Sequence, residues 1–447
     1  MSTALYPAGI GVIRISGEKA FETAGKIWRS RTGKSISELK QNTASVGTVF
    51  DGETDIDECV ALVFKEPHSF TGENVVELSC HGGVYIMRKA LEAVIKAGAR
   101  PALPGEFSKR AFLNGKLDLT SAEAIMDLIG AQGDTAARAA LAQHRGALFN
   151  EIQSVKKRLV EISADITAWV DFPDEDVPSL EPNALKASLK AEKAELEQLS
   201  ENYSKGRIIK EGVDTVIIGR PNVGKSTLMN ALSGFEKSIV TEIPGTTRDV
   251  VEENVNFAGV VLKLWDTAGI RKTEDPVESI GVKRAREKLN SAQIILAVFD
   301  GSKELLNEDK EIIQQIEDRH VIAVINKCDL QIKTDREYIE SKIKHVVYIS
   351  AGKLEGLKIL ETKIKELVGT STFDPSAAFV ANLRQLECVH RAIEAISSAI
   401  DTVEQGFTLD AVTVYIDDAL NAVFELTGEK ASEEVIDRVF SKFCIGK

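Results

Sequence analysis

The chain has 447 residues, enough for about three domains, and its 43% hydrophobic and 28% charged residues are typical of a soluble globular protein. The formal net charge of −13 argues against indiscriminate nucleic-acid binding, which requires a broad basic surface. We expect a cytoplasmic protein without a membrane span, disulfide framework or zinc site, because the sequence has no long apolar run or signal segment and its five cysteines are scattered.

Residues 1–116 are predicted to form an α+β domain. Runs of β-branched residues predict strands at residues 9–17, 48–50, 59–64 and 75–80. Apolar spacing predicts helices at residues 18–28 and 84–96, the second with Ile86, Leu91, Val94 and Ile95 on one face. Arg14 and Glu77 are charges within apolar strands, so each lies either on an open face or paired in a pocket.

Two regions of long helices, 117–210 and 369–447, flank the centre of the chain. One apolar stripe steps by three, four and seven from Leu141 to Ile166, as on a single long helix, and a second runs from Leu383 to Val403. Further helices are expected at residues 184–199, 412–426 and 433–443. The pattern predicts an all-α domain split in sequence, with a nucleotide domain at 211–368 inserted into it.

A glycine-rich loop, Gly219-Arg-Pro-Asn-Val-Gly-Lys-Ser226, lies between an apolar strand and a helix. It matches the phosphate-binding pattern in which backbone N–H groups cradle the phosphates. Lys225 is placed to reach the β- and γ-phosphates, and the Ser226 hydroxyl is placed to ligate Mg²⁺. The positive end of the following helix dipole adds to the attraction.

The strands predicted after this loop alternate with helices, which indicates a Ras-like, doubly wound α/β sheet with ligands at the carboxyl ends of its strands. Asp266-Thr-Ala-Gly269 ends one strand, where it can reach the Mg²⁺ shell and the γ-phosphate. Asn326-Lys-Cys-Asp329 ends another, and its aspartate can accept two hydrogen bonds that guanine donates and adenine does not. Ser350-Ala351 fits a loop at the guanine carbonyl oxygen, so GTP is the expected substrate.

The residue after Gly269 is Ile270, where many GTPases place the glutamine that orients the attacking water. The nearby candidates to replace it are Glu274, Asp275 and Glu278. We favour Glu278, although position alone does not separate the three.

A switch segment, Thr241-Glu-Ile-Pro-Gly-Thr-Thr-Arg-Asp249, is expected to close on the γ-phosphate and bring Thr247 to Mg²⁺. Asn222, with oxygens of Thr241, Ile243 and Thr246, is placed to cage a monovalent cation, which would supply the charge that an arginine finger provides elsewhere. Lys225 and Glu278 are the expected catalytic residues of this site. The predicted nucleotide contacts are Asn222, Val223, Gly224, Lys225, Ser226, Thr227, Thr241, Glu242, Ile243, Pro244, Gly245, Thr246, Thr247, Asp266, Thr267, Ala268, Gly269, Asn326, Lys327, Asp329, Ser350 and Ala351.

Three segments outside the nucleotide domain complete a resemblance to the MnmE (TrmE) family of tRNA modification GTPases, within the TrmE-Era-EngA-like GTPases. They are Thr71-Gly-Glu-Asn-Val-Val-Glu77 with Cys80-His-Gly-Gly83, Pro104 to Leu119, and Phe443-Cys-Ile-Gly-Lys447. The resemblance spans essentially the whole chain. It implies a homodimer whose amino-terminal domain binds 5-formyl- or methylene-tetrahydrofolate, at the positions Arg14, Glu77, Lys116 and Lys447.

The resemblance also implies K⁺ at Asn222, Thr241, Ile243 and Thr246, Mg²⁺ at Ser226 and Thr247, and Glu278 as the residue that organises the water. It implies a flavoprotein partner similar to MnmG (GidA), which uses FAD and NADH and assembles with this chain into a heterotetramer or larger complex. Together they would attach an aminomethyl or carboxymethylaminomethyl group to carbon 5 of the wobble uridine of certain tRNAs.

Three alternatives stay open at this stage. The amino-terminal domain could serve only for dimerisation, a reading that folate binding would exclude. A switch-type GTPase that escorts RNA or ribosomal particles, without modification chemistry, would use the same nucleotide domain. The Cys444-Ile-Gly-Lys447 tail and the folate-like domain favour the modification enzyme. Cys444 is either a nucleophilic thiolate or a small buried residue on the apolar face of the last helix.

Overall fold

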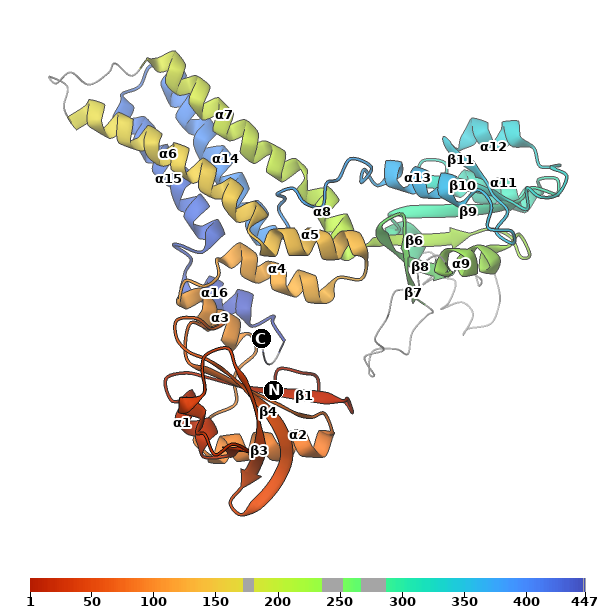
Figure 1. Ribbon diagram of the computed structural model, residues 1–447. Helices are drawn as coiled ribbons and strands as arrows, with labels where there is room; N and C mark the ends of the chain where they lie inside the picture. The colour runs from red at the N-terminus through yellow and green to blue at the C-terminus, as the bar shows by residue number, and fades with distance from the viewer. Residues whose placement is uncertain (172–180, 235–251, 267–286, 445, 447) are drawn as a thin grey trace. The chain divides into compact units, whose positions relative to one another are not determined.

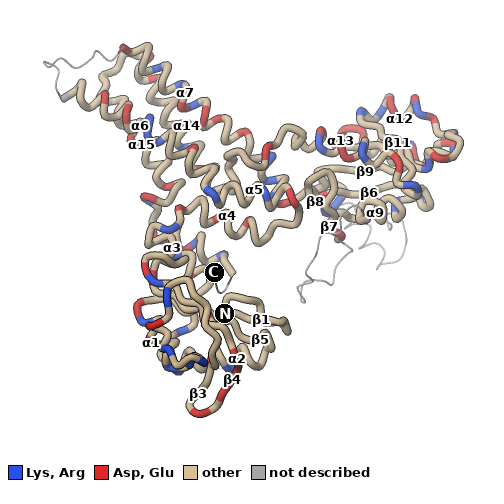
Figure 2. Tube along the Cα trace, viewed as in Figure 1, with Lys and Arg blue, Asp and Glu red and all other residues tan. Residues whose placement is uncertain are grey.

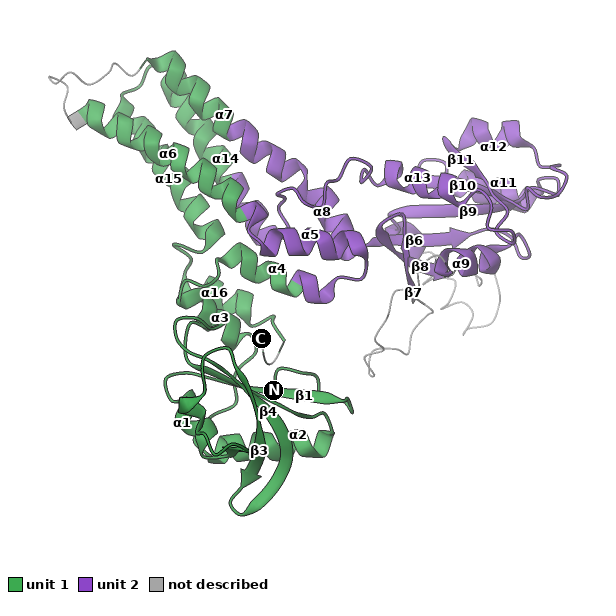
Figure 3. Cartoon of the chain, in the orientation of Figure 1, with its two compact units in different colours: residues 1–126, 149–192, 391–447 green, residues 127–148, 193–390 purple. Residues whose placement is uncertain are grey.

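A computed structural model of the chain describes residues 1–171, 181–234, 252–266, 287–444 and 446. The chain divides into two compact units, and each is assembled from segments that are distant in sequence (Figure 3). Unit 1 comprises Met1–Met126, Phe149–Glu192 and Arg391–Lys447, and unit 2 comprises Asp127–Leu148 and Lys193–His390. Within the described ranges, no helix is both long enough and apolar enough to cross a membrane.

An antiparallel sheet in the order β1-β5-β4-β3-β2 forms the amino-terminal part of unit 1 (Figure 1). Its strands are β1 (Ile10–Ser16), β2 (Trp28–Ser30), β3 (Ala44–Asp51), β4 (Thr54–Phe64) and β5 (Val75–His81). The accompanying helices are α1 (Ala20–Gly25), η1 (Ile36–Glu38), α2 (Val84–Lys96) and α3 (Glu106–Leu113). The strand predictions are confirmed. The helix expected at 18–28 is shorter, because Trp28 already begins strand β2.

Helix α2 has the predicted bounds, and of the predicted face Val94 is buried while Ile86 and Leu91 are partly buried against the core. Its buried residues are Met87, Ala90, Ala93 and Val94, whereas Ile95 is 37% exposed. Met87 packs closely on β1, where a Cβ at Gly11 would lie 2.4 Å from the Met87 sulfur. The prediction counted the large aliphatic residues and passed over the small and flexible ones that allow this close approach.

The helices that follow include the two predicted apolar stripes. These helices are α4 (Leu119–Gly130), α5 (Asp134–His144), α6 (Ala147–Asp171), α7 (Pro182–Glu201), α8 (Tyr203–Glu211), α14 (Leu383–Glu404), α15 (Leu409–Thr427) and α16 (Glu433–Phe440). The first stripe does not lie on one helix, because Gly146 has a φ of 91° and separates α5 from α6. Leu383, expected on the second stripe, is 68% exposed at the start of α14.

Within unit 1 the helices are joined by packing and ion pairs. Ile152, Val155, Leu159 and Ile166 of α6 are buried, as predicted. Arg158 of α6 donates from Nε to Glu192 of α7 across 2.6 Å, and the Glu192 side chain is only 5% exposed. A separate cluster joins α4 to the carboxyl-terminal helix α16.

Unit 2 contains a six-stranded sheet in the order β11-β10-β9-β6-β8-β7. Its strands are β6 (Val213–Ile218), β7 (Glu252–Phe257), β8 (Val260–Asp266), β9 (Ile294–Asp300), β10 (Val321–Asn326) and β11 (His345–Tyr348). Its helices include α9 (Lys225–Ser233), α11 (Asn307–Ile316), α12 (Arg336–Lys342) and α13 (Leu357–Leu367). Among the described strands, β7 alone is antiparallel to its neighbour, and the sequence did not predict it.

Successive residues of β6 pack on opposite faces of this sheet. Ile217 belongs to the core cluster with Leu228 of α9 and Leu360 of α13. Val216 belongs to another cluster, with Ile313 of α11. Helices therefore cover both faces, which confirms the predicted doubly wound arrangement and directs the loops after the parallel strands to one edge.

Candidate functional site: the phosphate loop and an amino-terminal hollow

The phosphate loop joins the end of β6 to the start of α9 and requires glycine at two positions. Gly219 has a φ of 147°, and a Cβ there would lie 2.4 Å from the Val298 carbonyl oxygen. Gly224 has a φ of 101°, and a Cβ there would lie 2.2 Å from Asn326 Nδ2. Both the backbone conformation and the close approach therefore exclude a side chain.

Lys225 lies at the first position of α9 and turns back over the loop. Its Nζ donates to the carbonyl oxygens of Gly219, across 2.7 Å, and of Arg220, across 2.9 Å. Ser226, the next residue, is exposed at the amino-terminal end of the helix. The loop thus has a cation, a hydroxyl and the positive end of a helix dipole side by side, a combination suited to binding phosphates.

Asn326, at the end of β10, connects three parts of the predicted nucleotide site. Its side chain is buried, with Nδ2 donating to the Val223 carbonyl oxygen across 3.0 Å. Its Oδ1 accepts from the Ala351 backbone N–H, also across 3.0 Å. One amide thus fixes the phosphate loop relative to the loop after β11.

The neighbours of Asp329 favour its ionised carboxylate, which can accept hydrogen bonds. Ser350 donates from Oγ to Asp329 Oδ1 across 2.8 Å, and Lys353 Nζ lies 3.5 Å from Oδ2. The Ser350 hydrogen bond, with the positive charge of Lys353, lowers the pKa of Asp329. The carboxylate is therefore ionised at neutral pH and able to accept the two hydrogen bonds of guanine.

The structure brings together the predicted residues of the phosphate loop with those at the ends of β10 and β11. Asp266 ends β8 at the same edge of the sheet. The remaining predicted site residues lie outside the described ranges: Thr241, Glu242, Ile243, Pro244, Gly245, Thr246, Thr247, Thr267, Ala268, Gly269, Glu278 and Lys447. The alternatives Glu274 and Asp275 and the neighbouring Ile270 lie outside them as well.

A hollow of ≈ 430 Å³ opens in unit 1 beside Arg14. Arg14 and Glu77 face each other on neighbouring strands, and Arg14 Nε and Nη2 each lie 2.7 Å from Glu77 Oε1. The guanidinium also lies over the rings of Phe70 and Phe107, 5.4 and 5.6 Å from their centroids. The sequence left open whether these two charges lie on an open face or are paired in a pocket, and the structure shows that they are paired.

A network of charges that the sequence analysis did not single out lines the same hollow. Arg100 donates to both oxygens of Glu106, and Arg110 bonds both Glu106 and Glu73. The Arg100 hydrogen bond, aided by Arg110 and the Leu103 N–H, lowers the pKa of Glu106 to about 2. Glu73 lies in the segment 71–77, and Glu106 and Arg110 lie in the segment 104–119. The sequence motifs therefore contain these charges, but only the fold brings them together.

The other residues expected near a folate are placed differently. Lys116 is exposed in the turn after α3, and a Cβ at Gly72 would lie 3.5 Å from its Cε. Gly446 lines the hollow. Cys444 is exposed and lies beyond α16, which ends at Phe440. The interpretation of Cys444 as a small buried residue of the last helix is therefore wrong, because that helix stops earlier.

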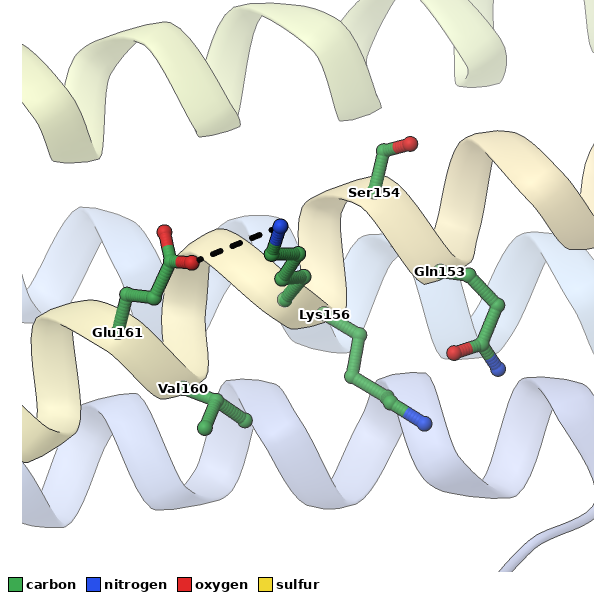
Figure 4. A pocket seen from close by; sticks show the side chains of 6 residues that line it. Gln153, Ser154, Lys156, Val160 and Glu161 are labelled. Carbon is green, nitrogen blue, oxygen red and sulfur yellow. Dashed lines mark ion pairs between the residues drawn. The ribbon is translucent and has the colours of Figure 1, made fainter.

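One other hollow of the described residues offers no comparable site. A shallow hollow along α6 is lined by residues of that helix alone, among them Val160 and the ion pair of Lys157 with Glu161 at 3.9 Å (Figure 4). Acidic and basic residues are interspersed along the helices of both units (Figure 2). Among the residues with described positions, no three His, Cys, Asp or Glu side chains form a cluster that could hold a metal ion.

Comparison with known proteins covers almost the whole chain. Residues 1–116 match the family described as GTP-binding protein TrmE N-terminus, and residues 119–444 match the MnmE helical domain. A tRNA modification GTPase MnmE of Alkaliphilus oremlandii is 41% identical over 455 residues, covering 100% of this chain and 98% of the relative. Its namesake in Natranaerobius thermophilus is 43% identical over 453 residues with the same coverage.

A third relative of that name, from Clostridioides difficile strain 630, is 39% identical over 450 residues, covering 100% of this chain and 98% of the relative. Among solved structures, the G domain of the T. maritima FeoB iron transporter is 28% identical and covers 34% of this chain and 96% of its own, with a TM-score of 0.27. That score is too low to support a functional conclusion.

Proposed function

This chain belongs to the MnmE family of tRNA modification GTPases, and from that premise we propose that it is the potassium-activated GTPase of a two-protein system that modifies tRNA. It is a GTP-hydrolysing enzyme of tRNA modification. With an MnmG-like flavoprotein that uses FAD and NADH, it attaches an aminomethyl or carboxymethylaminomethyl group to carbon 5 of the wobble uridine. GTP hydrolysis drives association of the two GTPase domains of a homodimer.

The observation that carries the GTPase part is the joining of phosphate loop and guanine-recognition residues by Asn326. Asp329, oriented by Ser350, accepts from the guanine base, and Lys225 exchanges its loop carbonyls for phosphate oxygens. Ser226 is exposed at the helix end and would hold Mg²⁺, which neutralises charge on the β- and γ-phosphates. Asn222 is exposed in the same loop and would contribute to the potassium site.

The hollow beside Arg14 suits a flat heteroaromatic ring with hydrogen-bonding edges. It combines apolar side chains such as Leu91 and Val94 with the Arg14 guanidinium and the charged network around Glu106. We assign this hollow and its surroundings to the tetrahydrofolate one-carbon carrier, with Arg14, Glu77, Lys116 and Lys447 as the contacting residues. The arrangement supports a ligand that is partly apolar and partly polar.

The test is GTP turnover by the full chain in potassium and in sodium buffer, with 5-formyltetrahydrofolate binding measured on the same preparation. We expect strong activation by potassium, and we expect Glu278→Ala to abolish it while leaving GTP binding intact. Glu274→Ala and Asp275→Ala are the matched controls, because they remove the other two acidic candidates.

Turnover that does not depend on the cation would contradict the potassium site. Equal loss in Glu274→Ala or Asp275→Ala would reassign the residue that organises water. Absence of folate binding would remove the one-carbon chemistry and favour a switch-type GTPase that acts with RNA or ribosomes.

A further inference from the structure

Lys327 adopts a backbone conformation that requires support from its surroundings. Its φ is 64°, in the left-handed region that a residue with a Cβ rarely occupies. Its Nζ donates to the Asn222 carbonyl oxygen across 2.9 Å and to Asp300 Oδ2 across 2.7 Å. The side chain therefore spans from the end of β10 to the phosphate loop, with a carboxylate fixing its charged end.

Asp300 is the last residue of β9 and the direct register partner of Asn326 on β10. Its side chain is only 2% exposed. Its Oδ1 accepts from the backbone N–H of Ser302 across 3.0 Å and from the Ser302 hydroxyl across 2.7 Å, which leaves Oδ2 for Lys327. Burial raises the pKa of Asp300, but the hydrogen bonds from Lys327 and Ser302 outweigh it and lower the pKa.

The partner of Lys327 in the phosphate loop is also in an unusual conformation. Asn222 has a φ of 64°, and its carbonyl oxygen is turned toward the Lys327 ammonium. The buried carboxylate holds that ammonium in one place, because a half-buried lysine without a partner would turn toward water. Asp300 thus acts on the phosphate loop through Lys327.

We propose that Asp300 is a positioning residue of the GTP site, which sets the affinity for guanine nucleotides by holding Lys327 between the guanine-recognition segment and the phosphate loop. Loss of the Asp300 carboxylate should weaken the binding of both GDP and GTP. The chemical step, which depends on groups around the γ-phosphate, is left unchanged.

The test measures the affinity of the full chain for fluorescent GDP and GTP analogues in wild type and in Asp300→Asn. Asparagine can still accept from Ser302, but it offers Lys327 no negative charge. Loss of a hydrogen bond between charged groups predicts Kd values for both nucleotides higher by about 10- to 100-fold. KM for GTP should rise accordingly, while kcat at saturating GTP should stay within about twofold.

Three variants separate positioning from a general structural role. Ser302→Ala, the matched control, removes a hydroxyl from the same carboxylate and leaves the ion pair, so Kd should change less than about twofold. In a Lys327→Met background, Asp300→Asn should have almost no further effect, since the contact through which it acts is already lost. Asp300→Glu keeps the charge but displaces it by one methylene, and it should give an intermediate Kd.

The proposal is overturned if Asp300→Asn binds nucleotide as wild type does, or if its effect is equally large in the Lys327→Met background. A fall in kcat at unchanged KM would also overturn it. If Asp300→Asn does not fold, Asp300→Glu decides the question through the same cycle with Lys327→Met. If the effects of Asp300→Glu and Lys327→Met on Kd are then additive, the positioning role of Asp300 is rejected.

Discussion

Asn326 donates from Nδ2 to the carbonyl oxygen of Val223 across 3.0 Å, so the residue that ends β10 also holds the phosphate loop closed. The contact is buried and lies between segments about a hundred residues apart in sequence. It ties the segment that we propose recognises the base to the loop that we propose binds the phosphates, because a change at either end of the contact alters the other.

Asn326→Asp isolates this contact, because the carboxylate can accept from the Ala351 N–H but cannot donate to Val223. We expect the free energy of unfolding of unit 2 to fall by about 1–3 kcal/mol, the cost of a buried unpaired carbonyl, and Kd for GDP to rise at least about tenfold. Thermal unfolding and nucleotide titration measure the two effects. Gln315→Ala, on the exposed side of α11, is the control and should change neither.

Gly224→Ala should disable the phosphate loop while Gly352→Ala is tolerated. The new methyl group at position 224 would lie 2.2 Å from Asn326 Nδ2, at a φ of 101°. At position 352 nothing lies within 4 Å and the φ is not in the left-handed region. We expect loss of measurable GTP binding in the first variant and unchanged binding in the second. Normal turnover by Gly224→Ala would mean that the loop adopts another conformation.

Glu106 should make the stability of unit 1 sensitive to acid. Its pKa is lowered from 4.5 to about 2, so its contribution to folding is complete above pH 4.5 and is lost as pH falls through about 2. Glu106→Gln should destabilise unit 1 by about 1–3 kcal/mol at neutral pH, because Arg100 and Arg110 lose a charged partner. Denaturant unfolding between pH 5 and 2 should then be less steeply pH-dependent in the variant than in wild type.

Arg14→Met tests the amino-terminal hollow. The substitution keeps much of the side-chain volume but leaves Glu77 without its partner and removes a donor from the hollow. We expect the affinity for 5-formyltetrahydrofolate to fall at least about tenfold in equilibrium titration. Arg31→Met removes an exposed ion pair with Glu58 on the same sheet and should leave folate affinity unchanged. Equal affinities in the two variants would place the ligand elsewhere.

The fold around the proposed nucleotide site was predictable because short, contiguous motifs encode it. Gly219 to Ser226 encodes its own turn and helix start, and apolar β-branched runs locate the buried parallel strands. Edge strand β7 was missed because its sequence is mostly polar, with Val255 and Phe257 as its buried residues. An edge strand needs only one apolar face, which leaves a weak local pattern.

The amino-terminal network was not predictable from local sequence. Glu73 and Arg110 are far apart in the chain, and only the packing of α3 beside the sheet makes them partners. Both residues lie in motifs that the family resemblance singled out, yet the motifs do not indicate which charges form ion pairs with each other. The break between α5 and α6 was missed for another reason: a glycine in a helical pattern is ambiguous until its φ is known.

The split of unit 1 along the chain has a consequence for synthesis. Phe440 and Phe443 pack with Leu119 and Ala122, which are made more than three hundred residues earlier, in one apolar cluster. Unit 2 has its complete sequence by His390, whereas unit 1 still lacks Arg391–Lys447 at that point. On the ribosome, the internal nucleotide-binding unit can therefore fold first, while the helices of unit 1 made before it must wait until Arg391–Lys447 has been made before their core closes.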